Sequence, residues 1–129
     1  MNQSVSDPES PIALLVSVAE PTRLRILNCL AAAPLFVSDL QEVLDLPQPT
    51  VSRHLTVLKR SEVVKDTSVA PFVLYRLHRS GAPHGRMLAA ILEALTTDPS
   101  LQAERRRALD KSRARARSRT GLASEGATA

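Results

Sequence analysis

The chain has 129 residues, of which 43% are hydrophobic and only 2% aromatic, with a single cysteine and a formal net charge of +4. This length suits one domain with a packed core, and the shortage of aromatic residues favours an aliphatic, largely helical core. One cysteine excludes an intramolecular disulfide and a multi-cysteine zinc site, and no apolar run approaches the roughly 18 residues of a membrane span. Because the N-terminus also lacks the pattern of a secretory signal, we expect a cytoplasmic protein with no membrane partner.

The positive charge is concentrated near the C-terminus. Residues 1–104 hold nine Lys and Arg against eleven Asp and Glu, whereas residues 105–129 hold eight against two. The body is therefore close to neutral, and overall charge is weak evidence for a nucleic-acid partner. We predict a disordered N-terminus over 1–10, a folded domain over 11–98, and an Arg-rich, largely disordered tail over 99–129.

Three short helices are predicted in the first third of the chain. The apolar segment 11–20 predicts the first helix, and the segment 22–33, which lies between two prolines, predicts the second. A third is expected to begin at Ser38, because Ser38 and Gln41 have the spacing of a capping box. The break after it, at Asp45–Pro47, is tight enough to place the following helix against the third.

The segment Gln48–Arg60, QPTVSRHLTVLKR, predicts the helix around which the rest is organised. Pro49 suits the first helical position, and Val51, Leu55 and Leu58 fall on one apolar face. The opposite face is polar and cationic, with no acidic residue, and would complement a DNA major groove. With the helix and break before it, this segment predicts a helix-turn-helix.

The chain after this helix predicts a β-hairpin and a final helix. Val63 begins an extended segment, a turn is expected near 67–71, and Phe72–Leu77 alternates as a second strand. The apolar stripe of a helix at about His84–Leu95 is too wide for so small a domain to cover, so this helix and the first one form the expected homodimer surface. The predicted fold class is mainly α with a small β-hairpin wing, a winged helix-turn-helix.

Three segments, in this order of elements, resemble the ArsR family of bacterial winged-helix repressors, also called the ArsR/SmtB family. They are AEPTRLRILNCL, SDLQEVLDLPQPTVSRHLTVLKR and FVLYRL, within residues 12–95. The resemblance implies a homodimeric repressor with its two recognition helices in successive major grooves of an inverted repeat. It also implies that a ligand, often a metal or metalloid ion, relieves repression.

Three departures from the family pattern bear on regulation. Arsenic-sensing members carry a cysteine pair before the third helix, whereas segment 34–39 here offers no thiolate, the soft ligand that As(III) needs. Zinc-sensing members use acidic and histidine pairs on the last helix, which His84, Glu93 and Asp98 do not reproduce. Glu62 stands where members commonly have the glycine that ends the recognition helix. We therefore expect no metal site and no cofactor, and the inducer is not identified.

The expected DNA contacts lie on the polar face of the recognition helix and on the wing. Side chains near the start of this helix are expected to reach base edges, and Arg53 could bind guanine through two hydrogen bonds. The other polar side chains are expected to meet phosphates. Base contacts are assigned to Gln48, Thr50, Ser52 and Arg53, and phosphate contacts to His54, Thr56, Lys59, Arg60 and Lys65. The alternative is an ordinary amphipathic surface helix with a solvated charged face.

Other features allow a structural and a functional interpretation. Cys29 is expected to be a buried small hydrophobe, with a redox sensor as the alternative, and His78 and His84 are expected at the surface rather than in a metal pair. The Arg-rich tail is either an inert solvated end or a non-specific DNA clamp.

Two other function classes stay open, whereas an enzyme is not expected. The chain could be a protein–protein adaptor, or a binder of RNA or single-stranded DNA driven by the tail, which the shortage of aromatic stacking residues disfavours. With no Gly-rich phosphate loop and no nucleophile motif in the sequence, we expect no enzymatic activity.

Overall fold

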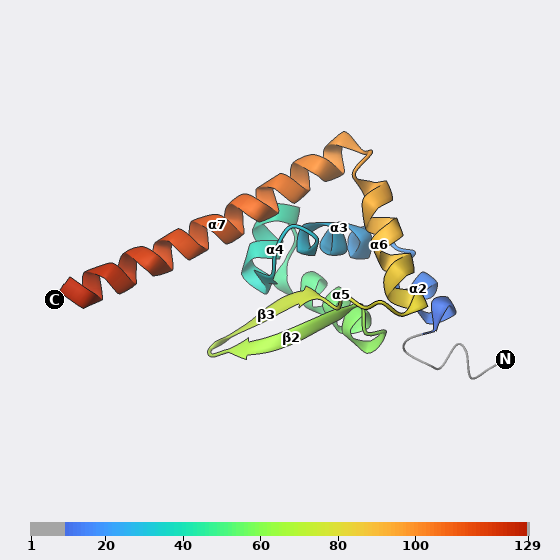
Figure 1. Ribbon diagram of the computed structural model, residues 1–129, viewed down its shortest axis with the longest axis horizontal. Coiled ribbons are helices and arrows are strands. Elements are labelled where there is room, and N and C mark those ends of the chain that lie inside the picture. Colours follow the sequence, from blue (N-terminus) through green and yellow to red (C-terminus); the bar gives the residue numbers. More distant parts are fainter. Residues whose placement is uncertain (1–9, 129) are drawn as a thin grey trace.

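The computed structural model describes residues 10–128, with side chains described through residue 118. A β-hairpin and one long C-terminal helix extend from a body of shorter helices (Figure 1). The elements in chain order are α2 (Pro11–Val18), α3 (Pro21–Leu30), β1 (Leu35–Phe36), α4 (Val37–Leu44), α5 (Gln48–Arg60), β2 (Val64–Val69), β3 (Phe72–Leu77), α6 (Pro83–Leu95) and α7 (Pro99–Thr128). The disorder predicted for residues 1–9 falls outside the described residues.

Helices α2, α3 and α4 each begin where a side chain accepts a hydrogen bond from a free backbone N–H group. Ser10 Oγ accepts the N–H of Ala13 at 3.0 Å before α2, and Glu20 Oε2 accepts the N–H of Arg23 at 2.8 Å before α3. At α4, Asp39 Oδ2 accepts the N–H of Phe36 at 2.9 Å.

The start predicted for the third helix is wrong by one residue. α4 begins at Val37, and its first turn uses Asp39 instead of the predicted capping box of Ser38 and Gln41. Phe36 is held extended because it pairs with Leu74 in the sheet, and this fixes where the helix can begin.

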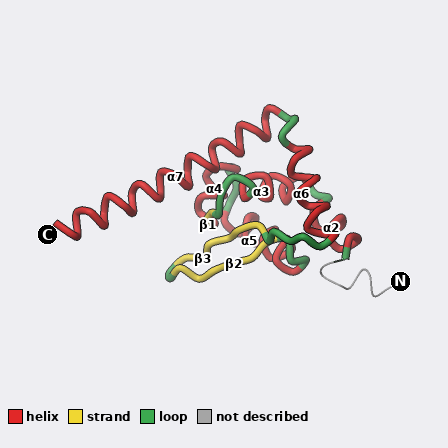
Figure 2. The backbone as a smooth tube through the Cα atoms, in the orientation of Figure 1, coloured by secondary structure: helices red, strands yellow, loops and turns green. Residues whose placement is uncertain are grey.

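The sheet has the strand order β1-β3-β2 and is antiparallel throughout. The pairs from Val64↔Leu77 to Val69↔Phe72 form the wing, so its turn is shorter than the one predicted at 67–71. Figure 2 shows the wing projecting from the helices. Strand β1 was not predicted, since two residues are too few to show alternation.

The core is aliphatic, as expected from the composition. Val51, Leu55 and Leu58 of α5 are all fully buried, which confirms the predicted inner face of this helix. They pack in one cluster with Leu27 of α3 and Leu40 of α4. Burying each of these side chains contributes roughly 1.5–3 kcal/mol, which fixes α5 against the helix before it. In the described part of the chain, no helix is both long and apolar enough to cross a membrane.

Helix α7 is the largest departure from prediction. The segment expected to be largely disordered forms one helix from Pro99 to Thr128, lying along α3 and α4 (Figure 1). Ala108 is fully buried in the core and Glu104 is 8% exposed. Arg, Ala, Lys and Gln all favour helix, so the same composition that suggested a solvated tail also supports a helix once one face is packed.

Polar contacts hold α7 on the body. Arg25 Nε lies 3.1 and 3.0 Å from the two carboxylate oxygens of Glu104. Arg105 donates to Asn28 Oδ1 at 2.9 Å and to the carbonyl of Leu92 at 3.0 Å. Two more ion pairs follow along the helix, Lys111–Glu42 and Arg115–Asp39. The folded unit therefore extends beyond the boundary predicted at residue 98.

Candidate nucleic-acid interface

The turn before α5 sets the position of this helix. Asp45 adopts a left-handed conformation with φ 55°, which ends α4, and Leu46 N–H donates to the Gln41 carbonyl at 3.1 Å. Pro47 precedes α5, whose bounds Gln48–Arg60 are those predicted. The result is a helix-turn-helix whose second helix keeps its polar face outward.

Most of the predicted contact residues lie on this outer face. Gln48, Arg53, Thr56, Lys59 and Arg60 are exposed on α5 and Lys65 is exposed on β2, while Thr50 and Ser52 are half-buried. We call this set of residues the α5–wing surface.

Hydrogen bonds distinguish the members of the α5–wing surface. Gln48 Nε2 donates to Ser52 Oγ at 2.7 Å, so these two side chains are already oriented by each other. Lys59 Nζ lies 2.8 Å from Asp66 Oδ2, and this hydrogen bond raises the pKa of Lys59. Among the described residues, Arg53 and Arg60 have no hydrogen-bond or ion-pair partner. These two are the cations on α5 free to meet an anion.

His54 lies differently from the other predicted contacts. Its side chain is 14% exposed, and its Nδ1 is 3.2 Å from Arg23 Nη1 and 3.8 Å from Glu20 Oε2. Both partners belong to the corner between α2 and α3. His54 therefore links α5 to that corner, a contact that the periodicity of α5 alone did not indicate.

The entry to the wing depends on Glu62. This residue has φ 58°, the left-handed conformation that glycine adopts without cost, and Val63 N–H then donates to the Leu58 carbonyl at 3.1 Å. The Glu62 carbonyl lies 2.8 Å from His78 Nδ1, so the wing root is tied to the end of α5. The backbone at the start of the wing therefore has the conformation that a glycine would adopt, and Glu62 is strained in it.

The wing carries one cation that the sequence analysis did not select. Arg76 on β3 is directly opposite Lys65 on β2 and donates from Nη1 to Thr67 Oγ1 at 2.7 Å. The alternation of the predicted strand already placed Arg76 on the face opposite Tyr75 and Leu77, and this pattern could have identified it as an exposed cation.

Both histidines near the wing were expected at the surface, but only His78 is partly exposed. His84 is 1% exposed, and neither of its ring nitrogens has a hydrogen-bond partner among the described residues. Its ring meets that of His78 edge to face, with 6.2 Å between centroids. Within residues described by the structure, no group of three or more His, Cys, Asp or Glu side chains is placed to hold a metal ion.

Cys29 has the environment of a core residue. Its side chain is fully buried, and burial raises the pKa of the thiol to about 12, with the Glu104 carboxylate adding to the effect. Arg25, the nearest basic residue along the helix, is bound to Glu104. A reactive thiolate needs exposure and a lowered pKa, so the structure favours the packing interpretation.

Comparisons with known proteins agree with this geometry. The model of the family described as "Bacterial regulatory protein, arsR family" matches residues 20–66. The transcriptional repressor SdpR of Bacillus subtilis is 32% identical over 62 residues, covering 48% of this chain and 69% of that protein. The transcriptional regulator KmtR of Mycobacterium tuberculosis is 30% identical over 107 residues, covering 78% of this chain and 80% of that protein.

A solved structure of HlyU from Vibrio cholerae superimposes with a TM-score of 0.57 at 31% identity, covering 64% of this chain and 88% of that one. The matched part spans 47% of the length of the transcriptional repressor SmtB of Mycobacterium tuberculosis and 80% of that of KmtR. The match covers α3, the helix-turn-helix and the first residues of the wing, and it includes every residue of the α5–wing surface. The chain belongs to the ArsR family of bacterial regulatory proteins.

Proposed function

We propose that this protein is a homodimeric transcriptional repressor that binds an inverted-repeat operator in double-stranded DNA in the bacterial cytoplasm. The observation that carries the proposal is the pair of exposed cations on α5, Arg53 and Arg60, which have no partner among the described residues, together with the exposed Lys65 of the wing. Leaving cations unpaired on a near-neutral body is consistent with an anionic partner at this surface. Relatives that are transcriptional repressors, such as SdpR, support the same assignment.

The first turns of α5 would carry the base contacts. Gln48, Thr50, Ser52 and Arg53 lie toward the end of α5 that a helix-turn-helix points at base edges. Arg53 is the candidate for two hydrogen bonds to guanine, because its planar donor group matches the guanine edge. Phosphate contacts are proposed for Thr56, Lys59, Arg60 and Lys65, with Lys59 the weakest because Asp66 already neutralises it.

The dimer surface is proposed on α2 beside α6. Ile12, Leu15 and Val16 are 45%, 49% and 65% exposed, a group of large apolar side chains on one short helix. α2 also packs on α6, so residues of both helices would contribute to the proposed interface (Figure 1). A monomer rarely leaves such a group in water, and covering it with a second copy would give the two-fold symmetry that an inverted repeat requires.

Selecting bound sequences from random double-stranded DNA tests the proposal. We expect an inverted repeat whose half-sites are about one helical turn apart, with two protomers on each DNA. A protein–protein adaptor would give no enriched sequence. A binder driven by the Arg-rich helix would retain all sequences equally and lose them together at high salt.

The dimer is tested separately with Leu15→Glu. Burying the new carboxylate at an apolar interface is unfavourable, so the variant should sediment as a monomer and lose operator affinity. A variant that stays dimeric would place the interface elsewhere.

A further inference from the structure

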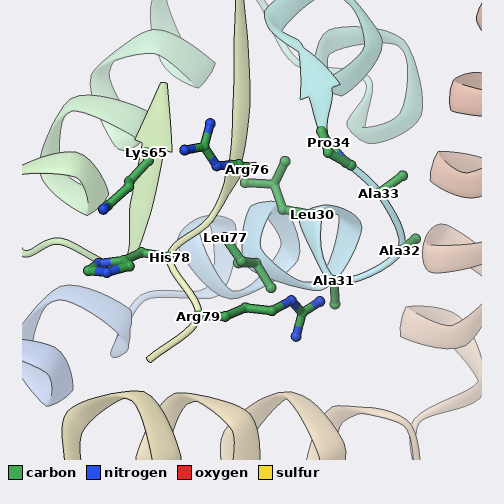
Figure 3. A pocket seen from close by; sticks show the side chains of 10 residues that line it. All are labelled: Leu30, Ala31, Ala32, Ala33, Pro34, Lys65, Arg76, Leu77, His78 and Arg79. Carbon is green, nitrogen blue, oxygen red and sulfur yellow. The ribbon is translucent and has the colours of Figure 1, made fainter. Parts of the chain in front are cut away.

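An open cavity of about 530 Å³ lies between the end of α3, the loop that leads to β1, and the root of the wing. Figure 3 shows it from close by, with alanines on one side, Lys65, Arg76 and His78 on the other, and Arg79 extending toward the alanines. We call it the wing-root cavity. Its size falls within the range of sites for small molecules.

The lining of the wing-root cavity is basic and apolar. Its charged side chains are Lys65, Arg76 and Arg79, with His78 beside them, and no acidic residue takes part. Leu30, Leu77 and the segment 31–34 supply the apolar part. A site of this composition suits a ligand with an anionic group and an apolar body.

The basic side chains around the cavity are short of counter-charges. Among the described residues, Lys65 and Arg79 have no hydrogen-bond or ion-pair partner, and Arg76 donates only to the neutral hydroxyl of Thr67. Lys65 and Arg76 are also directly opposite each other in the β2–β3 ladder. Like charges at opposed ladder positions destabilise a sheet, and an anion near both would offset that repulsion.

The end of α3 offsets part of this charge. The guanidinium of Arg79 points toward Ala31, just beyond the last residue of α3 (Figure 3). A helix C-terminus carries roughly half a negative charge, which favours a cation there. This accounts for at most one of the three fixed charges, so the cavity stays positive on balance.

We propose that the wing-root cavity binds a small organic anion, a carboxylate or phosphate group on a short apolar body. The guanidinium of Arg79 would hold the anionic group, Arg76 and Lys65 would add positive charge on the wing side, and the Ala31–Pro34 side would contact the apolar part. One consequence rests on the proposed function. Lys65 is also a proposed phosphate contact, so an anion held here would weaken operator binding.

The test titrates DNA-free protein with hexanoate, hexyl phosphate, inorganic phosphate and hexylamine. Binding is followed by calorimetry and by the NMR signals of the Leu30 and Leu77 methyl groups. We expect hexanoate or hexyl phosphate to bind saturably and move both methyl signals, and the arm that binds more tightly identifies the anionic group. Hexylamine, which has the same apolar body, should bind neither tightly nor at this place. Equal effects from hexanoate and hexylamine would overturn the proposal.

Paired variants test the position of the site. Arg76→Gln/Arg79→Gln should weaken binding about tenfold or more, because it removes the proposed donor Arg79 and a second positive charge of the lining. Arg106→Gln/Arg113→Gln removes the same charge from exposed positions on α7 and should leave binding unchanged. An equal loss in both pairs would show attraction to bulk charge alone. Binding of inorganic phosphate without movement of the methyl signals would show an adventitious ion only.

Two further measurements keep the outcome unambiguous. Arg79→Gln alone should also weaken binding, and it is safe for the fold because Arg79 has no partner among the described residues. Operator affinity with and without hexanoate is measured in a separate experiment. If the protein binds hexanoate but no operator, the anion site is supported and the proposed function is overturned. If it binds an operator but not hexanoate, the proposed function is supported and the anion site is overturned.

Discussion

Arg115 on α7 forms an ion pair with Asp39 in the first turn of α4, and its guanidinium carbon lies 4.7 Å from the centroid of the Phe36 ring. The Asp39 side chain is 2% exposed, and its other oxygen accepts the N–H of Phe36. A buried carboxylate is stable only when its charge is compensated. The C-terminal helix therefore stabilises the start of the helix-turn-helix.

Replacing Arg115 should destabilise the fold. Arg115→Ala leaves the Asp39 carboxylate with one backbone hydrogen bond, and we expect the free energy of unfolding to fall by about 1–2 kcal/mol. The loss is smaller than for a fully buried pair because the Arg115 side chain is 38% exposed. Urea denaturation followed by circular dichroism measures it.

Arg117→Ala is the matched control, since Arg117 is exposed on the same helix and has no partner among the described residues. It should change the free energy of unfolding by less than about 0.5 kcal/mol. If both variants lose the same amount, helix propensity rather than the ion pair holds α7.

The exposed arginines of α7 should contribute little to DNA binding. Arg106, Arg113 and Arg117 are free of partners in the described part of the chain, but α7 packs on α3 and α4 and lies across these helices from α5 (Figure 1). We expect the triple change to glutamine to leave the slope of log affinity against log salt unchanged. Each lost phosphate contact would reduce that slope by about 0.9, so a reduction of two or more would restore the DNA-clamp interpretation. Substitution is preferable to deleting 105–129, which would remove the buried Ala108.

Local sequence patterns predicted the helix α5 and the strand β3 accurately. The bounds of α5, its buried face and the β3 strand all follow from residues close in sequence: a proline at a helix start, apolar side chains at helical spacing, and alternation in a strand. The outer face of α5 was predicted by the same periodicity. These features need no knowledge of distant residues.

The errors arose where distant residues decide the structure. β1 exists only because Leu35 and Phe36 pair with β3, and that pairing moves the start of α4. α7 is ordered on the body through partners far away in the sequence, such as Arg25 with Glu104, 79 positions apart, and Asp39 with Arg115, 76 positions apart. Similarly, His54 faces Arg23, 31 residues earlier. Composition alone cannot distinguish an Arg-rich solvated tail from an Arg-rich helix whose charges meet buried acids.

Glu62 offers a test of the strain at the wing entry. Glu62→Gly should raise the free energy of unfolding by about 0.5–1 kcal/mol, since glycine adopts φ 58° without the cost that a side chain imposes. Part of that gain is offset by the greater freedom of glycine in the unfolded chain. Thermal or urea unfolding provides the measurement. Glu62→Ala keeps the strained conformation and removes the carboxylate, so it should show no comparable gain.

Arg53 distinguishes base recognition from general attraction to DNA. Arg53→Ala should weaken binding to the selected operator by about 1–3 kcal/mol, while binding to unrelated DNA changes much less, because a guanine contact exists only in the operator. Arg60→Ala is the companion variant, since Arg60 is equally exposed and unpaired but lies at the end of α5 away from the turn. It should weaken operator and unrelated DNA by similar factors. Fluorescence anisotropy on both DNAs at one fixed salt concentration gives the comparison. If Arg53→Ala lowers both affinities equally, Arg53 contacts phosphate, and the base contacts belong to Gln48, Thr50 and Ser52.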